Sequence, residues 1–249
     1  MNMPINTSCP VYIINLECAQ DRMTNMHEQL VSLNIEYTRI SAIKGADLSE
    51  FEINQVYSPT LNKQYFRAGL SLGEIGCYMS HRNVWRKMVA ENIAYAVILE
   101  DDMLLTPQFT DIFQHTDIFK QYDLIKLADN RDHQPKHKKT IDDVFELINF
   151  TKIPNCATGY TLSLGGAKKL LAREKFYRPV DIDMQFCHEL NLSVFGLRPY
   201  PITENKNMTS NIVTLNGGFH GKKSTSFIRN IKYRVHLWWH RKNYISGEF

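Results

Sequence analysis

Short apolar segments alternate with amphipathic ones along most of the chain. Residues 11–16 are almost wholly apolar and predict a buried strand, residues 21–33 carry apolar side chains at helical spacing, and residues 35–40 predict a second strand. A strand, a helix and a strand in succession favour a parallel sheet. The pattern therefore predicts an α/β fold.

A long helix is predicted over residues 72–90, with Ser71 as its N-cap and Glu74 at the capping-box position. Residues 45–69 are mixed and polar, and we expect a loop that folds over a ligand. Residues 129–139 are dense in charge and predict a mobile surface loop. The other predicted elements are strands at residues 95–99, 123–127, 145–150, 157–164 and 193–197, and helices at residues 48–56, 107–119, 165–173 and 183–190.

The composition is that of a folded protein. The 249 residues are 43% hydrophobic and 22% charged, which argues against disorder and allows a sizeable core. No internal repeat or linker divides the sequence. We therefore expect one α/β domain, residues 1–220, followed by a basic amphipathic tail, residues 221–249.

The tail carries most of the positive charge. It holds seven Lys or Arg residues and one acid, a net charge of +6, which leaves −3 for the rest of a chain whose total is +3. Apolar side chains recur at helical spacing from Phe227 to Trp239, with cations between them. Such a helix suits a membrane interface that contains anionic lipid, and docking on its own domain is the alternative. Nucleic-acid binding is not favoured, because the body is net acidic and lacks a recognised module.

The five cysteines are scattered, odd in number and without a C-x-x-C pair, so we expect free thiols. The N-terminal residues lack the pattern of a signal peptide, and no apolar run reaches the length of a membrane span. These features favour a cytoplasmic protein.

Three adjacent acids follow the predicted strand at residues 95–99. In an open α/β sheet, ligands bind beyond the carboxyl ends of the strands. The carboxylates of Glu100, Asp101 and Asp102 repel one another there unless a cation or hydrogen bonds neutralise them. Hard divalent ions such as Mg²⁺ and Mn²⁺ prefer oxygen ligands shared with substrate phosphates. The motif alone fits either a cation site or a solvated loop.

Several ordered motifs extend over about residues 10–215. The motifs are Ile-Ile-Asn-Leu at residues 13–16, Asp21-Arg22, Glu-Ile-Gly-Cys at residues 74–77, Ser80-His81, Leu-Glu-Asp-Asp at residues 99–102, Gly-Gly-Ala at residues 165–167 and Pro-Val-Asp at residues 179–181. With these motifs in this order the chain resembles glycosyltransferase family 25, which includes bacterial lipopolysaccharide and lipooligosaccharide galactosyltransferases and, more distantly, collagen galactosyltransferases.

The resemblance implies a Rossmann-like fold of the GT-A type with a mostly parallel central sheet. It implies a hexosyltransferase that inverts the anomeric carbon, with UDP-galactose as donor and Mn²⁺ or Mg²⁺ as cofactor. The implied acceptor is the terminal sugar of a lipid-linked lipooligosaccharide or lipopolysaccharide, at the inner face of a bacterial cytoplasmic membrane. Two alternatives stay open: a catalytically silent nucleotide-sugar-binding protein of the same fold, and a transferase for UDP-glucose or a UDP-N-acetylhexosamine.

Under this resemblance the acidic motif holds the cation, which stabilises the charge on the departing diphosphate. Asp102 is the expected direct ligand. Asp101 or Glu100 reaches the ion through water or binds the ribose, and a cap on the next turn is the alternative for Glu100. His220, in a glycine-rich stretch, is a further candidate ligand, with a flexible turn as its alternative.

An inverting transferase needs a base that takes the proton from the acceptor hydroxyl. Asp181, at the Pro-Val-Asp position, is the first choice and Asp183 is the reserve. If the segment is extended, both side chains point to the same side. The alternative for either residue is a helix N-cap.

The remaining candidates are assigned to donor binding. Arg22 fits a contact with uracil or phosphate, or a surface salt bridge. His81 fits a donor contact or a packing role within its helix, and Tyr160 fits stacking on a sugar or the core. The donor-binding candidates are Asn15, Arg22, Ser80, His81, Glu100 and Asp101.

Overall fold

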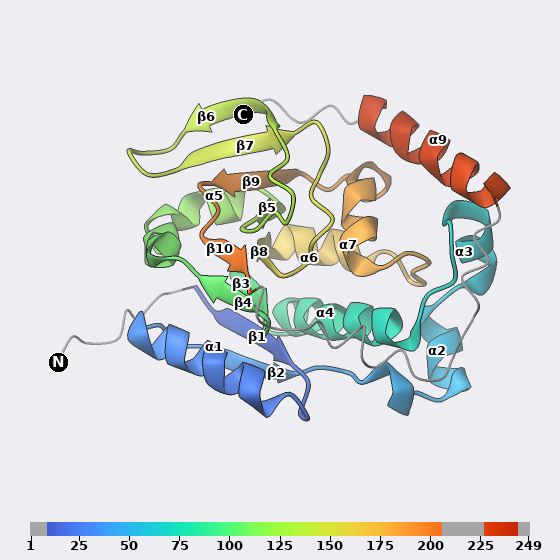
Figure 1. Cartoon of the computed structure of the whole chain (residues 1–249), viewed down its shortest axis with the longest axis horizontal. Helices are drawn as coiled ribbons and strands as arrows, with labels where there is room; N and C mark the ends of the chain where they lie inside the picture. Colours follow the sequence, from blue (N-terminus) through green and yellow to red (C-terminus); the bar gives the residue numbers. More distant parts are fainter. Residues whose placement is uncertain (1–8, 206–226, 244–249) are drawn as a thin grey trace.

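The computed structural model describes residues 9–205 and 227–243, which form a central sheet with helices on both sides (Figure 1). The strands of this sheet are β1 (Val11–Asn15), β2 (Thr38–Ser41), β3 (Tyr95–Glu100), β5 (Leu124–Lys126), β6 (Pro135–Thr140), β7 (Glu146–Phe150), β8 (Gly159–Ser163) and β9 (Val194–Arg198). A separate ribbon pairs β4 (Met103–Leu105) with β10 (Ile202–Glu204).

The helices lie between and beside these strands. The α-helices are α1 (Gln20–Ser32), α2 (Glu50–Val56), α3 (Pro59–Tyr65), α4 (Leu72–Ala90), α5 (Thr116–Gln121), α6 (Leu164–Leu171), α7 (Val180–Asp183) and α9 (Phe227–Asn243). The 3-10 helices are η1 (Gly45–Asp47), η2 (Pro107–His115) and η3 (Met184–Leu190).

The sheet has eight strands in the order β2-β1-β3-β8-β5-β9-β7-β6. The pairs β1–β2, β1–β3 and β5–β9 are parallel, as the strand–helix–strand pattern predicts. The pairs of β8 with β3 and β5, and of β7 with β9 and β6, are antiparallel. Six strands therefore run in one direction and two in the other. The fold is α/β, and its central sheet is mixed, with parallel and antiparallel pairs.

Both faces of the sheet are buried. In β1, Val11 and Ile13 pack with α1 and α5 on one face, while Tyr12 and Ile14 pack with α4 and α6 on the other. The α4 helix begins with the predicted capping box, in which the Ser71 hydroxyl accepts from the Glu74 N–H. The result is three layers, and α4 and α6 lie on the face that carries the site.

Some predicted elements differ from the observed ones. Residues 135–140 form β6 rather than a loop, pairing with β7 at the edge of the sheet. The strand is exposed along most of its length, and its lysines leave no apolar pattern from which a strand could be predicted. Charged residues are nevertheless common on edge strands. The predicted strand at residues 35–40 lies slightly later, at Thr38–Ser41, and residues 107–119 form η2 and part of α5 rather than one helix.

The α9 helix lies across α3 and η3 (Figure 1). Tyr233 and Leu237 pack against Phe66 and Phe186, and the Arg229 guanidinium donates to the carbonyl of Phe66. Docking of this part of the tail on its own domain is therefore observed. Residues 221–226 and 244–249, and the expected boundary at residue 220, lie outside the described residues. Within the described part, no helix combines the length and the hydropathy needed to span a membrane.

Candidate active site

The site lies where three strand ends meet. Ile14 near the end of β1 is in register with Glu100 at the end of β3, and the two strands are parallel. β8 runs the other way beside β3, so the residues before β8 lie at the same edge. The Glu100 N–H donates to the Thr158 carbonyl at 2.8 Å. The topology thus gathers acids and loop residues at one end of the sheet.

Asp101 is held by the end of β1 and by α1. Its carboxylate accepts from the Asn15 side chain at 2.5 Å and from Arg22 at 3.1 Å. Asn15 also accepts from Arg39 at 2.9 Å, which orients the amide. Burial raises the pKa of Asp101, while Asn15 and Arg22 oppose the rise. Asn15 and Arg22 therefore position an acid, and Arg22 lies beside the site predicted for the donor.

Asp102 has an oxygen without a partner. Its Oδ1 is buried with no hydrogen bond among the described residues, and its Oδ2 lies 3.5 Å from Arg22. Burial, with repulsion from Glu100 and Asp101, raises the pKa of Asp102 to about 7. A buried carboxylate oxygen without a donor costs free energy unless a cation or a proton compensates it. Asp102 therefore fits the predicted role of a cation ligand.

Glu100 is held by α4. His81 Nε2 lies 3.1 Å from its Oε1, and the Cys77 thiol lies 3.5 Å from the same oxygen. Hydrogen bonds from His81 and the nearby charge of Arg22 bring the pKa of Glu100 below its usual value, despite burial. His81 itself is fully buried and bonds the Tyr160 hydroxyl at 2.8 Å. His81 and Tyr160 thus take their packing alternatives, and His81 positions Glu100.

The chemistry of these donors suits a hard divalent cation. Asp102 and Glu100 offer carboxylate oxygens at the pocket wall, the ligands that Mg²⁺ and Mn²⁺ prefer. A second possible group, formed by Cys77, His81 and Glu100, contains softer sulfur and nitrogen ligands and would suit zinc better. The third predicted ligand, His220, lies outside the described residues.

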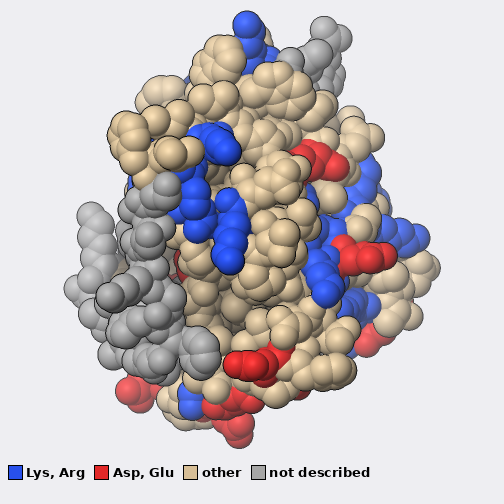
Figure 2. All heavy atoms as spheres, turned by 90° about the vertical axis from the view of Figure 1, so that its right-hand side faces the viewer, with Lys and Arg blue, Asp and Glu red and all other residues tan. Residues whose placement is uncertain are grey.

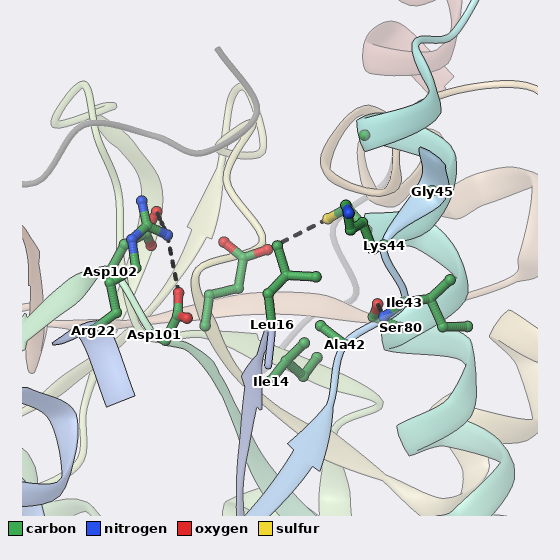
Figure 3. Close-up of a pocket in the computed structure, with 13 residues that line it drawn as sticks. Ile14, Leu16, Arg22, Ala42, Ile43, Lys44, Gly45, Ser80, Asp101 and Asp102 are labelled. Carbon is green, nitrogen blue, oxygen red and sulfur yellow. Dashed lines mark hydrogen bonds and ion pairs between the residues drawn. The ribbon is translucent and has the colours of Figure 1, made fainter. Parts of the chain in front are cut away.

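The acids line one wall of a pocket that we call the acidic pocket. Arg22, Asp101 and Asp102 gather on one side, and Ile14, Leu16 and Ala42 form an apolar wall between them and α4 (Figure 3). Its cavity volume is about 100 Å³. An apolar wall beside a cationic and acidic end is suited to a ligand with a flat ring and phosphates.

Gly76 on α4 and Gly45 on the opposite wall let these two segments approach each other closely. A Cβ on Gly76 would lie 2.4 Å from the Ile43 carbonyl oxygen and 2.6 Å from the Gly45 nitrogen. Ser80, one turn later, accepts from the Ile43 N–H at 2.8 Å and donates to the Gly76 carbonyl. Ser80 lines the pocket, and it also fixes the segment that follows β2.

A second pocket, the Asp181 pocket, adjoins the first. Asp181 is half-buried at its wall, and the two pockets share Cys77 and Glu100. Burial raises the pKa of Asp181 to about 6, while the Ile182 N–H and Lys126 lower it. A carboxylate with a pKa near neutrality is suited to accept a proton. Asp181 therefore lines a pocket that also has Glu100 at its wall.

Asp183 lies elsewhere. The segment that contains Asp181 and Asp183 is not extended but forms the helix α7, which begins at Val180 after Pro179. The two aspartates therefore do not point to the same side. Asp183 is 2% exposed, lies 2.8 Å from Arg173 and 3.2 Å from Arg178, and accepts from the Tyr78 hydroxyl. It lines neither pocket in the described structure. Asp183 is therefore held in a buried ion-pair network, away from the two pockets.

A buried lysine beneath the site escaped the sequence interpretation. Lys126, on β5, is fully buried, and its ammonium group donates to the Cys156 carbonyl at 2.7 Å. Burial lowers its pKa, while the negative charges of Asp181 and Glu100 raise it. The signal in the sequence was a single lysine inside the apolar strand at residues 123–127. Lys126 therefore supplies a buried positive charge that acts on Asp181.

A mixed α/β sheet with acids at a strand end, beside paired pockets, is typical of enzymes that bind nucleotide-linked substrates. The profile of glycosyltransferase family 25 (LPS biosynthesis protein) matches residues 8–185, and the chain belongs to this family of glycosyl-transferring enzymes.

Its relatives include procollagen galactosyltransferase 1-A of Xenopus laevis, which is 29% identical over 181 residues. A glycosyltransferase 25 family member of Anopheles gambiae is 30% identical over 182 residues. Each alignment covers 70% of this chain and 30% of the relative. The chain thus matches less than a third of the length of these relatives.

Proposed function

We propose that the protein transfers galactose from UDP-galactose to an acceptor hydroxyl with inversion at the anomeric carbon. The observation that carries the proposal is that the acidic pocket and the Asp181 pocket are neighbours that share the wall residues Cys77 and Glu100. A nucleotide diphosphate in the first pocket would present its sugar to the second. Several relatives are procollagen galactosyltransferases, which supports galactose as the donor sugar.

Asp181 is proposed as the base. As the acceptor oxygen bonds to the anomeric carbon, the bond from that carbon to the diphosphate oxygen breaks, and its electron pair leaves with UDP. The acceptor proton goes to the Asp181 carboxylate. Since this is a single displacement, no covalent sugar–enzyme intermediate is needed and the configuration inverts.

The diphosphate end is assigned to residues around the acids. Asp102, with Glu100, would hold Mn²⁺ or Mg²⁺, which supplies Lewis-acid stabilisation of the leaving phosphates. Arg22, 3.1 Å from Asp101, presents a guanidinium at the same wall and can bind phosphate directly. Asn15 holds Asp101, and Ser80 and His81 act by positioning the wall segment and Glu100.

We propose a sugar of a lipid-linked lipopolysaccharide or lipooligosaccharide as acceptor, at the inner face of a bacterial cytoplasmic membrane. The description of the family as an LPS biosynthesis protein supports this acceptor. The outward face of α9 supports the location, because Ile231, Val235 and Trp238 are exposed there beside cations. Apolar side chains with interleaved cations favour an anionic membrane surface.

The test is a donor screen. The protein is incubated with UDP-galactose, UDP-glucose or a UDP-N-acetylhexosamine and a terminal-glucose acceptor, with Mn²⁺ or with EDTA. We expect a β-linked galactoside by NMR, loss of turnover in EDTA, and loss of Mn²⁺ stimulation in Asp102→Asn. UDP binding without transfer from any donor would instead identify a silent nucleotide-sugar-binding protein.

A further inference from the structure

A third pocket, which we call the basic pocket, lies between α9 and the body of the molecule. Five cationic side chains line it, and its lining residues include no acid in the described structure. Figure 2 shows several Lys and Arg side chains on the face of the molecule that carries α9 and α3. The five cations come from four separate segments and are Arg67, Arg131, Lys152, Arg234 and Arg241.

The charge of this pocket is not neutralised from within. Across residues 9–205 and 227–243, none of the five cations forms a salt bridge with an acid, and the nearby Asp129 is bonded to His133 at 2.8 Å. Burial and the charges of Arg241 and Arg131 lower the pKa of Lys152, while the charge of Asp129 partly opposes this. Outside the described ranges the sequence contains a single acid, Glu248. Like charges held together in this way favour an anion.

The basic pocket adjoins the place where transfer is proposed. Arg67, Asn155 and Ile182 line both it and the Asp181 pocket. The diphosphate of the donor is assigned to the far side, next to Arg22 and Asp102. An anion among these cations would therefore belong to the molecule that enters from the side of Asp181.

We propose that the basic pocket binds a phosphate group carried by the acceptor sugar, which makes the acceptor a phosphorylated glycan. The inference rests on the proposed function and specifies its acceptor. Four of the five cations are guanidinium groups, whose planar donors match phosphate oxygens in pairs. Tyr233 and Leu237, which also border this pocket, are buried against the body of the molecule and hold α9 in place beside the cations. Lys152 is half-buried in the pocket and the four arginines are exposed around it. The half-buried lysine favours a discrete phosphate over a lipid surface.

The experiment measures binding independently of turnover. Glucose 6-phosphate and glucose are titrated into the full-length protein by calorimetry at low salt. We expect the phosphorylated sugar to bind at least tenfold more tightly, and we expect Arg234→Gln/Arg241→Gln to remove this difference. Lys232→Gln is the matched control, because Lys232 is an exposed cation of the same helix that does not line the pocket. Thermal unfolding verifies that all variants are folded.

Equal affinities for the two sugars, or an unchanged preference in the double variant, would overturn the inference. Loss of binding to anionic vesicles in the double variant, with glucose 6-phosphate binding intact, would assign these cations to lipid and also overturn it. Galactosyl transfer to a neutral glucoside is measured separately. Galactosyl transfer with equal binding of glucose 6-phosphate and glucose would disprove this inference alone. Preferential binding of glucose 6-phosphate without transfer to any acceptor would disprove the proposed function alone.

Discussion

Two aspartates that are two residues apart have opposite surroundings. Asp181 faces a pocket, and Asp183 is buried among arginines. We expect Asp181→Asn to lower kcat by about 10²–10⁴, the usual contribution of a general base, because the acceptor proton loses its carboxylate. UDP affinity and the melting temperature should stay near wild type. An Asp181→Asn enzyme with undiminished kcat would exclude this residue as the base.

The same substitution at Asp183 should have the opposite profile. Asp183→Asn removes the negative charge that pairs with Arg173 and Arg178 in the interior. Breaking a buried ion pair by removing one partner costs about 3–5 kcal/mol of stability. We expect Asp183→Asn to lower the free energy of unfolding, measured by urea titration, by about 3 kcal/mol. The kcat of the folded fraction should change far less than in Asp181→Asn. A variant with wild-type stability would show that the network is dispensable.

Lys126 affects the pH range in which the Asp181 carboxyl group is ionised. Its positive charge lowers the pKa of Asp181, which burial raises to about 6. Since the base must be ionised, activity should fall as the pH drops through about 6 in the wild type. Lys126→Met removes the charge at similar volume, so the pKa of Asp181 should rise and the acidic limb of the kcat profile should move to higher pH. The control is Lys138→Met, an exposed lysine on β6. An unmoved limb would show that Lys126 acts only through packing.

Single residues were predictable where the motif itself carried the chemistry. The acids at the end of a strand and Asp181 were selected in this way, and the structure places them at the walls of two neighbouring pockets. The positioning roles of His81 and Asn15 were not, because they depend on which side chain lies opposite, as in the contact of Asn15 with Asp101 across 86 positions of sequence. The burial of Asp183 likewise follows from Arg173 and Arg178 packing around a helix that the pattern started too late.

At the scale of elements, Gly76 explains part of the Glu-Ile-Gly-Cys motif. A methyl group there would collide with the backbone of the Ile43–Gly45 segment, which forms a wall of the acidic pocket. We expect Gly76→Ala to cost about 1–3 kcal/mol of stability, as overpacking does, and to weaken UDP binding at least tenfold. Gly69→Ala is the control, because nothing lies within 4 Å of its Cβ position. Unchanged UDP affinity in Gly76→Ala would show that the wall is free to shift.

Elements with strong apolar patterns were located correctly from sequence. β1, α1 and α4 lie close to their predicted ranges, since their buried faces are local features, whereas the mostly exposed β2 begins three residues later than predicted. The antiparallel insertion of β8 between β3 and β5 was not visible, because strand order depends on contacts between distant segments. That insertion matters for the site, since it brings the residues before β8 next to Glu100.

At the scale of the whole molecule, α9 has two distinct faces. Tyr233 and Leu237 are buried against the body, whereas Ile231, Val235 and Trp238 are 46%, 59% and 60% exposed. The exposed three are spaced at i, i+4 and i+7, so they form one stripe along the helix. Docking and membrane contact are therefore compatible, because they use different side chains.

We expect Ile231→Ser/Trp238→Ser to weaken binding to vesicles that contain anionic lipid at least tenfold, since apolar burial at the interface is lost. Turnover of a water-soluble acceptor should be unchanged, because neither side chain lines the acidic, Asp181 or basic pocket in the described structure. Phe51→Ser, an exposed apolar residue of α2, is the control and should bind vesicles as the wild type does. Co-sedimentation at low and high salt separates the apolar from the electrostatic part, because only the latter is screened. If the double variant sediments with vesicles like the wild type, α9 is not the membrane contact, and the outward stripe requires a different partner.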